Sequence, residues 1–392
     1  MTTRPADDRV IVTSAQERFA LAACRSLSKA GYGVAAVADV TPAATHWSRF
    51  CSERHTLVDA KRDPDAFVDG LAAIVREREY VAILPASDAA LVAISRRREL
   101  LEPYTRLGLP SHAVVDACTD KIRLQEAAAL AGIPAPDAVV CHSATDAGAA
   151  ASEFGFPIVI KARRTFFELD GRIEQRGSEL VHDRARLARL VDRFGVPFLV
   201  QRAVSGMVYS AAGVMTAEGL LAFAASRYLR TWPPDGGNVA FGETIVPPVG
   251  LENQVTSLLR HLGWEGIFEI ELIQNGSGEL RTIDVNPRLY GSMALAASAG
   301  TPFAVIWCDH LLGRPSTYPS TAQPGMRYRW EDADIRYAFA QLRHGRLRRA
   351  GAALAPRRRV VHAYFRLNDP APMVARAIVL ARGRARARLD HG

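Results

Sequence analysis

The chain is poor in cysteine, in lysine and in long apolar runs, and each shortage excludes a class of protein. Its five cysteines are scattered over 392 residues without a C-x-x-C pair, so we expect neither a zinc site nor a disulfide framework. The N-terminus lacks the basic and apolar regions of a signal peptide, and the longest mildly apolar tract, near residues 293–308, stops at Asp309. We therefore expect a soluble, cytoplasmic protein with reduced thiols and no transmembrane segment.

A nucleic-acid signature is missing despite a net charge of +8. In residues 321–392 arginine outnumbers aspartate and glutamate by 11, so the first 320 residues carry a net charge of about −3. No aromatic residue lies among the arginines from residue 374 onward, which argues against single-stranded nucleic-acid binding. We expect no nucleic-acid partner. Two interpretations of the basic segment stay open: a solvated tail, or a helix in peripheral contact with an acidic surface such as anionic lipid.

The N-terminal part shows the pattern of a doubly wound α/β domain without a dinucleotide motif. Apolar strands are predicted at 9–13 and 33–38 on either side of an amphipathic helix at 16–30, the order of a parallel α/β unit. A further strand is predicted at 81–85, followed by a helix that Ser87 can cap. No G-x-G-x-x-G follows the first strand, so the sequence does not support a dinucleotide site.

The segment 268–288 alternates apolar and polar residues on both sides of a glycine-containing turn, which predicts a β-hairpin. Its polar face collects Glu269 and Glu271 from the first strand, then Asp284 and Asn286 from the second. Such a face is either an ordinary solvated surface or the outline of a metal-phosphate site.

The register of this hairpin decides which carboxylates meet. A turn centred between Gly276 and Ser277 would place Glu269 opposite Asp284. Like charges directly opposed repel by roughly 0.2–1 kcal/mol unless a cation lies between them. Mg²⁺ accepts one or two carboxylates together with phosphate oxygens, so Glu269, Asp284 and the amide of Asn286 are candidate ligands.

The scarcity of lysine makes each retained lysine informative. Only four occur among 49 basic residues, so arginine supplies nearly all of the positive charge. Lys161 ends a short β-branched strand at 156–161, and Lys121 begins a predicted helix that Asp120 can cap. Both ammonium groups could reach a phosphate, although each lysine taken alone is also compatible with an ordinary surface position.

Taken in order, these segments resemble the ATP-grasp superfamily, in the branch that includes carbamoyl phosphate synthase and biotin carboxylase. The resemblance runs over about residues 9–313 and rests on four segments: 120–136, 156–162, 198–206 and 268–288. It implies a mixed α/β and α+β chain, in which an N-terminal doubly wound α/β (pre-ATP-grasp) domain precedes a two-lobed ATP-grasp fold that holds a nucleotide between its lobes.

Four regions are expected on this basis. The N-terminal α/β domain would span 1–115, the small nucleotide lobe 116–206, and the metal and substrate lobe 207–320. An arginine-rich C-terminal extension at 321–392 lies outside the resemblance.

The resemblance also implies roles for individual residues. Lys121 and Lys161 would contact the phosphates of ATP, with Lys161 taking part in catalysis. The segment of Gln201, Arg202 and Val204 would be the hinge that holds adenine.

The metal and the reacting carboxylate would lie on the hairpin. Glu269, Asp284 and Asn286 would hold Mg²⁺, as one or two ions that Mn²⁺ can replace, and Arg288 would face the reacting carboxylate or acyl phosphate as a catalytic residue.

Two further segments carry arginines. The segment after Lys161 is expected to be the lid over the triphosphate, and its arginines are either phosphate contacts or solvated charges: Arg163, Arg164 and Arg172. The glycine and proline residues of 226–244 predict a loop. Three of its side chains either bind an acidic or flat substrate or belong to an ordinary ordered loop: Arg227, Arg230 and Trp232.

The implied chemistry is carboxylate activation. A carboxylate is a poor electrophile until ATP phosphorylates it, and phosphoryl transfer depends mainly on positioning and charge neutralisation. We expect an ATP-dependent carboxylate-amine or carboxylate-thiol ligase that forms an acyl phosphate, releases ADP and phosphate, and uses small-molecule substrates; a homodimer is compatible with this. Two alternatives stay open: a bicarbonate-using carboxylase or carbamoyl-phosphate-like enzyme, and a non-catalytic nucleotide-binding scaffold.

Overall fold

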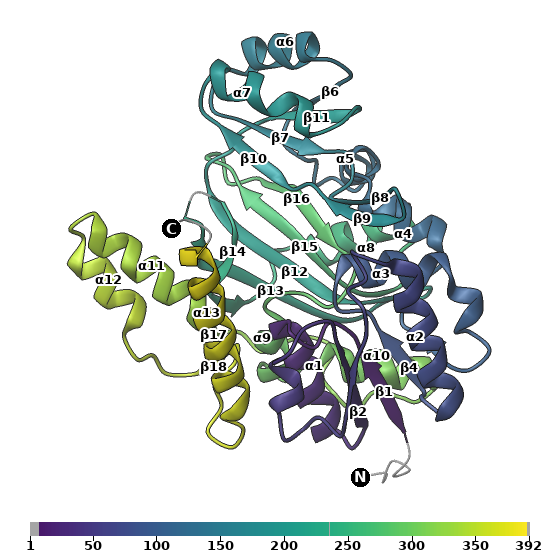
Figure 1. The fold of residues 1–392 in the computed structure, drawn as a ribbon. Coiled ribbons are helices and arrows are strands. Elements are labelled where there is room, and N and C mark those ends of the chain that lie inside the picture. The colour runs from purple at the N-terminus through teal and green to yellow at the C-terminus, as the bar shows by residue number, and fades with distance from the viewer. Residues whose placement is uncertain (1–7, 235, 390–392) are drawn as a thin grey trace.

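The computed structural model describes residues 8–234 and 236–389 and arranges them around one large central sheet (Figure 1). A small lobe stands above this sheet, the N-terminal domain lies below it, and a helical hairpin near the C-terminus projects to one side. Among the described residues, no helix combines the length and the apolarity needed to cross a membrane.

The N-terminal domain contains a five-stranded parallel sheet in the order β3-β2-β1-β4-β5. Val10 and Val12 of β1 pack on the side of α1 and α10, while Ile11 packs on the side of α2 and α3. Helices therefore cover both faces, and the predicted doubly wound arrangement is confirmed. Its elements are β1 (Arg9–Val12), α1 (Arg18–Lys29), β2 (Gly33–Ala38), η1 (Thr45–Trp47), β3 (Glu53–Thr56), α2 (Pro64–Glu77), β4 (Ala82–Leu84), α3 (Asp88–Arg96), η2 (Arg98–Leu100) and β5 (Arg106–Leu107).

Two helices, α4 (His112–Thr119) and α5 (Lys121–Leu130), lead into the small lobe. The lobe contains a four-stranded antiparallel sheet in the order β10-β7-β11-β6, with α6 and α7 packed on it, and a separate hairpin of β8 and β9. Its elements are β6 (Ala138–Cys141), α6 (Ala144–Phe154), β7 (Ile158–Ala162), β8 (Phe166–Leu169), β9 (Arg172–Gln175), β10 (Ser178–Val181), α7 (Arg184–Leu190), η3 (Val191–Arg193) and β11 (Phe198–Arg202).

The central sheet has seven strands in the order β16-β15-β12-β13-β14-β17-β18. Alternate residues of β15 enter different cores: Phe268 and Ile270 pack with α8, and Ile267 packs with α9 and α10. The sheet is therefore buried on both faces. Its strands and helices are β12 (Met207–Thr216), β13 (Gly219–Trp232), β14 (Asn238–Ile245), α8 (Leu251–Leu262), β15 (Gly266–Gln274), β16 (Leu280–Asn286), α9 (Met293–Ser298), α10 (Phe303–Leu311) and β17 (Arg327–Arg329).

The arginine-rich segment expected to be an extension is built into the rest of the molecule. It supplies β17 and β18 (Val360–His362) to the central sheet, together with α11 (Glu331–Arg343), α12 (Leu347–Leu354) and α13 (Ala371–Leu389). The carboxylate of Asp369 pairs with Arg25 at 2.9 Å and accepts hydrogen bonds from Ser48 and from the backbone N–H of Arg49. The C-terminal segment is thus anchored on the N-terminal domain.

All five cysteines are buried, and none of them forms a disulfide within the described residues. Cys24, Cys51 and Cys308 lie in the core between β1 and α10, Cys118 in the core on the other side of the N-terminal sheet, and Cys141 in the small lobe.

Candidate active site

The hairpin of β15 and β16 forms as predicted, but with a different register. Glu271 lies opposite Asp284, and Glu269 lies opposite Asn286. The prediction that Glu269 faces Asp284 is therefore wrong.

The cause lies in the turn and in an irregularity of the ladder. Asn275 closes the turn, since its side-chain oxygen accepts hydrogen bonds from the backbone N–H groups of Ser277 and Glu279. The register also shifts between Glu271 and Leu272. A longer turn and a bulge each move the partner along the strand, and together they bring Glu271 to Asp284.

The two lysines singled out in the sequence meet at this hairpin. Lys121 is the first residue of α5, where the Asp120 side chain caps the helix, and its ammonium group pairs with Asp284 at 2.6 Å. Lys161, on β7, donates a hydrogen bond of 3.0 Å to the carbonyl of Ile283. Both lysines are at most 8% exposed. Two elements of the small lobe therefore deliver buried positive charge to one strand of the central sheet.

Burial and mutual repulsion set the charges here. Burial, with the nearby Lys121, lowers the pKa of Lys161 to about 8. Burial alone would raise the pKa of Asp284, but Lys121 and Lys161 outweigh it and lower the pKa below its ordinary value. An added anion such as a phosphate would favour the ammonium forms.

The opposite wall of the hairpin is acidic. Glu269 is buried and accepts hydrogen bonds from Ser210, Tyr228 and the amide of Asn286 at 2.8–3.1 Å. Burial raises the pKa of Glu269. Glu271 accepts a hydrogen bond of 3.0 Å from Tyr228, and burial, together with Glu269 and Asp284, raises the pKa of Glu271 to about 8.

This donor set fits Mg²⁺. Glu271 and Asp284 offer carboxylate oxygens and Asn286 an amide oxygen. Burial, with the nearby Glu269 and Asp284, raises the pKa of Glu271, and a bound cation would favour its charged form. In the part of the chain that the structure describes, no three acidic, histidine or cysteine side chains form a ready-made metal cluster. Mg²⁺ is usually held by one or two carboxylates plus phosphate oxygens, so a site that a nucleotide completes agrees with this finding.

Arg288 follows β16 and reaches the N-terminal domain. Its guanidinium group pairs with Asp88 at 2.7 Å and donates to the amide oxygen of Asn286 at 3.1 Å. Burial disfavours the charge, but Asp88 raises the pKa of Arg288 above its ordinary value. Its Nε is buried without a hydrogen-bond partner, so a donor remains for an anionic substrate.

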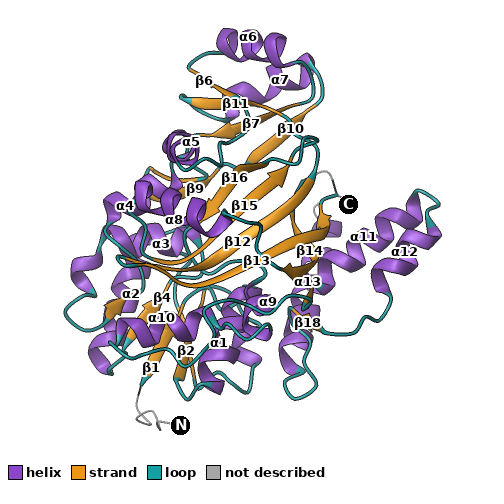
Figure 2. Cartoon of the chain, turned by 180° about the vertical axis from the view of Figure 1, so that it is seen from behind, coloured by secondary structure: helices purple, strands orange, loops and turns teal. Residues whose placement is uncertain are grey.

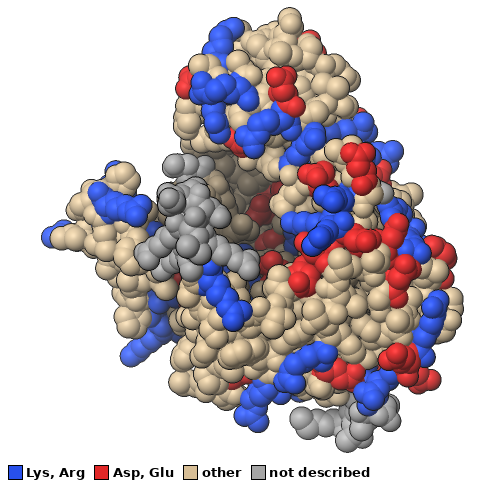
Figure 3. All heavy atoms as spheres, in the orientation of Figure 1, with Lys and Arg blue, Asp and Glu red and all other residues tan. Residues whose placement is uncertain are grey.

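Five of these residues line a cleft of about 390 Å³ between the central sheet, the N-terminal domain and the β8–β9 hairpin: Asp88, Glu269, Glu271, Asn286 and Arg288. Lys121, Lys161 and Asp284 are not among the described residues that line it. Figure 3 shows this hollow with acidic side chains on its walls. The charged residues that line it are Glu17, Arg18, Asp39, Asp59, Lys61, Asp88, Glu269, Glu271 and Arg288.

No family model matches the chain. The carbamoyl phosphate synthase large chain of Pasteurella multocida is 26% identical over 209 residues, which cover 49% of this chain and 19% of that protein. The chain thus spans about a fifth of the length of the curated relatives it matches.

Solved structures extend the likeness to most of the chain. The ADP complex of N5-carboxyaminoimidazole synthetase from Staphylococcus aureus has a TM-score of 0.63 at 13% identity and covers 83% of each chain. Biotin carboxylase from Campylobacter jejuni has a TM-score of 0.62 at 14% identity, covering 82% of this chain and 75% of the other. L-amino acid ligase from Bacillus licheniformis has a TM-score of 0.59 at 15% identity, covering 79% and 75%.

The chain has the ATP-grasp fold. The parallel N-terminal sheet, the antiparallel sheet of the small lobe and the central sheet follow one another along the chain.

In the ATP-grasp cleft, the β8–β9 hairpin occupies the position expected for the lid. Its strand β9 docks on the N-terminal domain: the backbone N–H of Ile173 donates to the carbonyl of Lys61, whose ammonium group donates to Gln175 at 2.6 Å. Two of the arginines near the lid are already paired with carboxylates, Arg163 with Asp120 at 2.7 Å and Arg164 with Asp116 at 2.6 Å. These pairs hold the start of the lid to α4 and α5.

The hinge residues lie at the end of β11. Gln201 donates to the carbonyl of Pro136 at 3.2 Å, and Arg202 pairs with Asp137 at 3.4 Å. Gln201, Arg202 and Val204 are not among the described residues that line the cleft. Their contact with adenine stays a prediction.

The segment 226–244 is not the loop that the sequence predicted. It belongs to the antiparallel strands β13 and β14, and its glycines and prolines are confined mainly to the turn between them. Arg227 pairs with Glu243 at 2.6 Å and Arg230 with Asp334 at 2.8 Å, so both arginines hold structural elements together.

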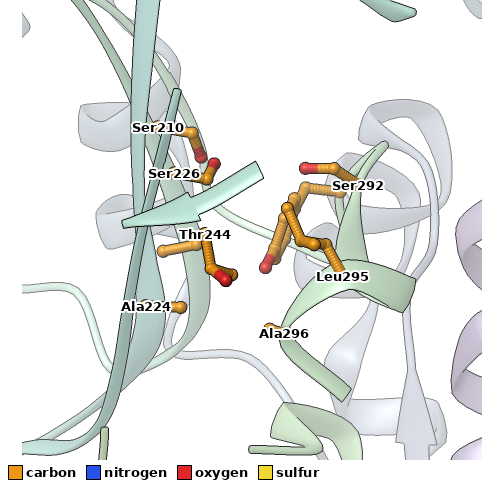
Figure 4. Close-up of a pocket in the computed structure, with 9 residues that line it drawn as sticks. Ser210, Ala224, Ser226, Thr244, Ser292, Leu295 and Ala296 are labelled. Carbon is orange, nitrogen blue, oxygen red and sulfur yellow. The ribbon is translucent and has the colours of Figure 1, made fainter. Parts of the chain in front are cut away.

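A small cavity of about 10 Å³ lies between β12, β13, β14 and α9. Ser210 and Ser226 face Ser292 across it, as Figure 4 shows, and Ser292 lines the main cleft as well. This volume holds about one water molecule, and one of its hydroxyl groups, that of Ser210, donates a hydrogen bond to Glu269.

Sequence reasoning missed several residues that surround the hairpin of β15 and β16. The sequence placed Glu271 on the polar face of the hairpin. The expected register put Glu269 opposite Asp284, however, and so left Glu271 out of the candidate metal ligands. Tyr228 and Ser210 come from strands β13 and β12, where nothing local marks them, and Asp88 appeared only as a residue of a helix N-terminus.

Proposed function

We propose that this protein is an ATP-dependent carboxylate-amine ligase that activates its carboxylate as an acyl phosphate and releases ADP and phosphate. The observation that carries the proposal is the meeting of Lys121, Lys161 and Asp284 on the hairpin that also presents Glu271 and leads to Arg288 in the cleft. One short hairpin and the lobe above it therefore carry three kinds of group: cations for phosphate, carboxylates for a metal and an arginine for the substrate.

Each residue then has a charge-based task. Lys121 and Lys161 balance the negative charge of the phosphates. Glu271, Asp284 and Asn286 hold Mg²⁺ or Mn²⁺, with Glu269 supporting Asn286 from behind. The bound ion supplies neutralisation of the phosphate oxygens between the nucleotide and the protein.

The reacting carboxylate is assigned to Arg288. Its guanidinium group is fixed by Asp88 and Asn286 and keeps a free Nε–H. A fixed guanidinium group binds a carboxylate with directed, charge-assisted hydrogen bonds, which would present one carboxylate oxygen for phosphorylation. The adenine would lie near Gln201, Arg202 and Val204, as the resemblance implies.

The wall of the N-terminal domain favours an amine as the nucleophile. Glu17, Asp39 and Asp59 line the cleft, and none of them forms an ion pair with another described residue. Unpaired carboxylates attract an ammonium group and repel a thiolate. We therefore assign the acceptor to the amines rather than to the thiols.

The test is a screen of amino acids and other small carboxylates, with and without amines, for ADP release by the purified full chain. Release should require both a carboxylate and an amine, and mass spectrometry should show their condensation product. Formation of AMP instead of ADP would exclude an acyl-phosphate route.

Arg288→Ala provides the matched mutational test. The variant should bind Mg·ATP nearly as well as the wild type, because the proposed phosphate contacts are Lys121 and Lys161 and not Arg288, yet it should lose substrate-dependent ADP release. Arg193→Ala, an exposed arginine of the small lobe, is the control. Equal activity of the two variants would contradict the role given to Arg288.

A bicarbonate-using enzyme is the second candidate. The structural neighbours include N5-carboxyaminoimidazole synthetase and a biotin carboxylase domain whose complex contains MgADP and bicarbonate. Bicarbonate is a small carboxylate that the same arginine would accommodate. ADP release that depends on bicarbonate, with no organic carboxylate present, would favour this candidate over the first.

A further inference from the structure

The α11–α12 hairpin is the part of the molecule that stands furthest from a shared core. It projects from the side of the central sheet in both views (Figures 1 and 2). Its two helices pack on each other through a small cluster that includes Ala338, Ala350 and Ala353. The residues in this seam are small, so the larger apolar side chains of the hairpin lie outside it.

Five large apolar side chains of the hairpin face outward. Their exposed fractions range from 39% to 69%, and they are Ile335, Phe339 and Leu342 on α11 with Leu347 and Leu354 on α12. Single exposed apolar residues are ordinary, but a group on one element marks an interaction surface.

Helix geometry places these five residues on the same side of the hairpin. Residues advance by about 100° along a helix, so Ile335, Phe339 and Leu342 form one stripe roughly a quarter turn from the seam. Leu347 and Leu354 lie two turns apart, again roughly a quarter turn from the seam of α12. On both helices the displacement from the seam has the same rotational sense. Because the helices run antiparallel and face each other, the two stripes therefore point to the same side of the hairpin.

The charge around this apolar face has one sign. Between Ile335 and Arg359 the sequence contains eight arginines and no aspartate or glutamate. The three acidic residues at the start of α11 are buried and engaged: Asp332 pairs with Arg376, Asp334 with Arg230, and Glu331 accepts backbone N–H groups. Two copies of this surface would repel each other, so the occupant must be anionic.

We propose that the α11–α12 hairpin docks on the surface of a membrane that contains anionic phospholipid. The five apolar side chains would enter the boundary between headgroups and acyl chains, and the flanking arginines would pair with lipid phosphates. A membrane surface requires an apolar row and cationic flanks without a carved pocket, which is what the hairpin offers. The inference is independent of the proposed ligase activity.

The experiment measures cosedimentation of the full chain with vesicles of phosphatidylglycerol and phosphatidylcholine. Binding should increase with the phosphatidylglycerol fraction and decrease with added salt. The double substitution Phe339→Glu with Leu347→Glu should weaken binding by at least about tenfold, and Arg343→Glu with Arg348→Glu should do likewise. Val249→Glu, at an exposed apolar position of a loop before α8, should leave binding unchanged.

Three results would overturn the proposal. Absence of binding to phosphatidylglycerol vesicles is the first, and a dimer in solution that the Phe339 and Leu347 substitutions dissolve is the second. Salt-sensitive retention on polyglutamate without vesicle binding is the third, and it would assign the face to an acidic protein. Circular dichroism and thermal melting check that each variant is folded; where the glutamate variant is not, Phe339→Ser with Leu347→Ser replaces it.

Discussion

Glu271 and Asp284 are the two carboxylates that the hairpin brings face to face, and their surroundings differ. Asp284 has an ammonium partner at 2.6 Å, whereas Glu271 has only the hydroxyl of Tyr228. Glu269, by contrast, already accepts three hydrogen bonds. A metal ion gains more from Glu271, whose charged form burial disfavours until a cation is bound, than from Glu269, whose oxygens already accept three hydrogen bonds.

This difference leads to a first prediction. Glu271→Gln should weaken the Mg²⁺ dependence of ATP binding more than Glu269→Gln does, because only the first substitution removes the carboxylate opposite Asp284. Isothermal titration with ATP at several Mg²⁺ concentrations measures both variants. A larger loss in the Glu269 variant would contradict this assignment and favour Glu269 as the metal ligand, as the sequence alone suggested.

A second residue, Asp39, predicts a pH dependence of stability. Burial, with the nearby Asp59, raises the pKa of Asp39 from 3.8 to about 6. The folded protein then holds a proton that the unfolded chain has lost, so the free energy of unfolding should fall as pH rises from about 4 to about 6. The full shift corresponds to about 3 kcal/mol, reduced to about 1 kcal/mol by the partial exposure of Asp39.

Urea unfolding at several pH values between 4 and 7 measures this effect. Asp39→Asn keeps an acceptor for Gln16 and removes the titration, so its stability should change less over the same interval. Parallel pH profiles for the two proteins would show that Asp39 is not responsible.

At the scale of elements, Asp120 connects the fold to the site. It is fully buried, caps α5 and pairs with Arg163, and Lys121 is the next residue. The cap fixes where α5 begins, and therefore where the ammonium group of Lys121 lies.

Asp120→Ala should lower the free energy of unfolding by about 2 kcal/mol, through loss of the cap and of the ion pair, and should weaken ATP binding. Asp120→Asn keeps a capping oxygen and should retain most of the ATP affinity. Thermal unfolding and nucleotide titration test both substitutions. Unchanged ATP affinity in the alanine variant would show that the Asp120 cap does not position Lys121 for ATP binding.

The hairpin also shows where sequence reasoning ends. Its existence, its polar face and its association with Lys121 and Lys161 follow from alternation, from the scarcity of lysine and from the family resemblance, and the structure confirms them. Its register depends on one turn and one bulge, whose geometry arises from hydrogen bonds of Asn275 that periodicity does not encode.

The strands β13 and β14 show a second limit. Glycine and proline in 226–244 predicted a loop, but a tight turn needs those residues as much as a loop does. What makes the flanking residues strands is pairing with distant partners, such as β14 with β17. Tyr228 enters the site because its strand β13 pairs with β12, which in turn pairs with β15.

At the scale of the molecule, the C-terminal segment unites the N-terminal domain with the central sheet. Asp369 is buried and joins Arg25 of α1 to the chain between β18 and α13. The sequence predicted an arginine-rich extension, because composition does not distinguish a solvated arginine from one that is paired with a carboxylate. The domain boundaries at 115, 206 and 320 stay a prediction.

Asp369→Ala should lower the free energy of unfolding by about 3–5 kcal/mol, since it leaves the buried guanidinium group of Arg25 without its carboxylate. It should also release the C-terminal segment to limited proteolysis between β18 and α13. Arg366→Ala, a neighbour outside this pair, is the control. Equal protease resistance of the two variants would show that other contacts hold the segment.

The buried thiols offer one more consequence. Because Cys118, Cys141 and Cys308 belong to three separate cores, a thiol-alkylating reagent added to the folded protein should be consumed only as each core opens. Peptide mass spectrometry of the alkylated protein would then give a separate opening rate for each of the three cores, with the native cysteines as the only probes. If nucleotide binding closes the small lobe on the sheet, the labelling of Cys141 should slow while that of Cys308 does not.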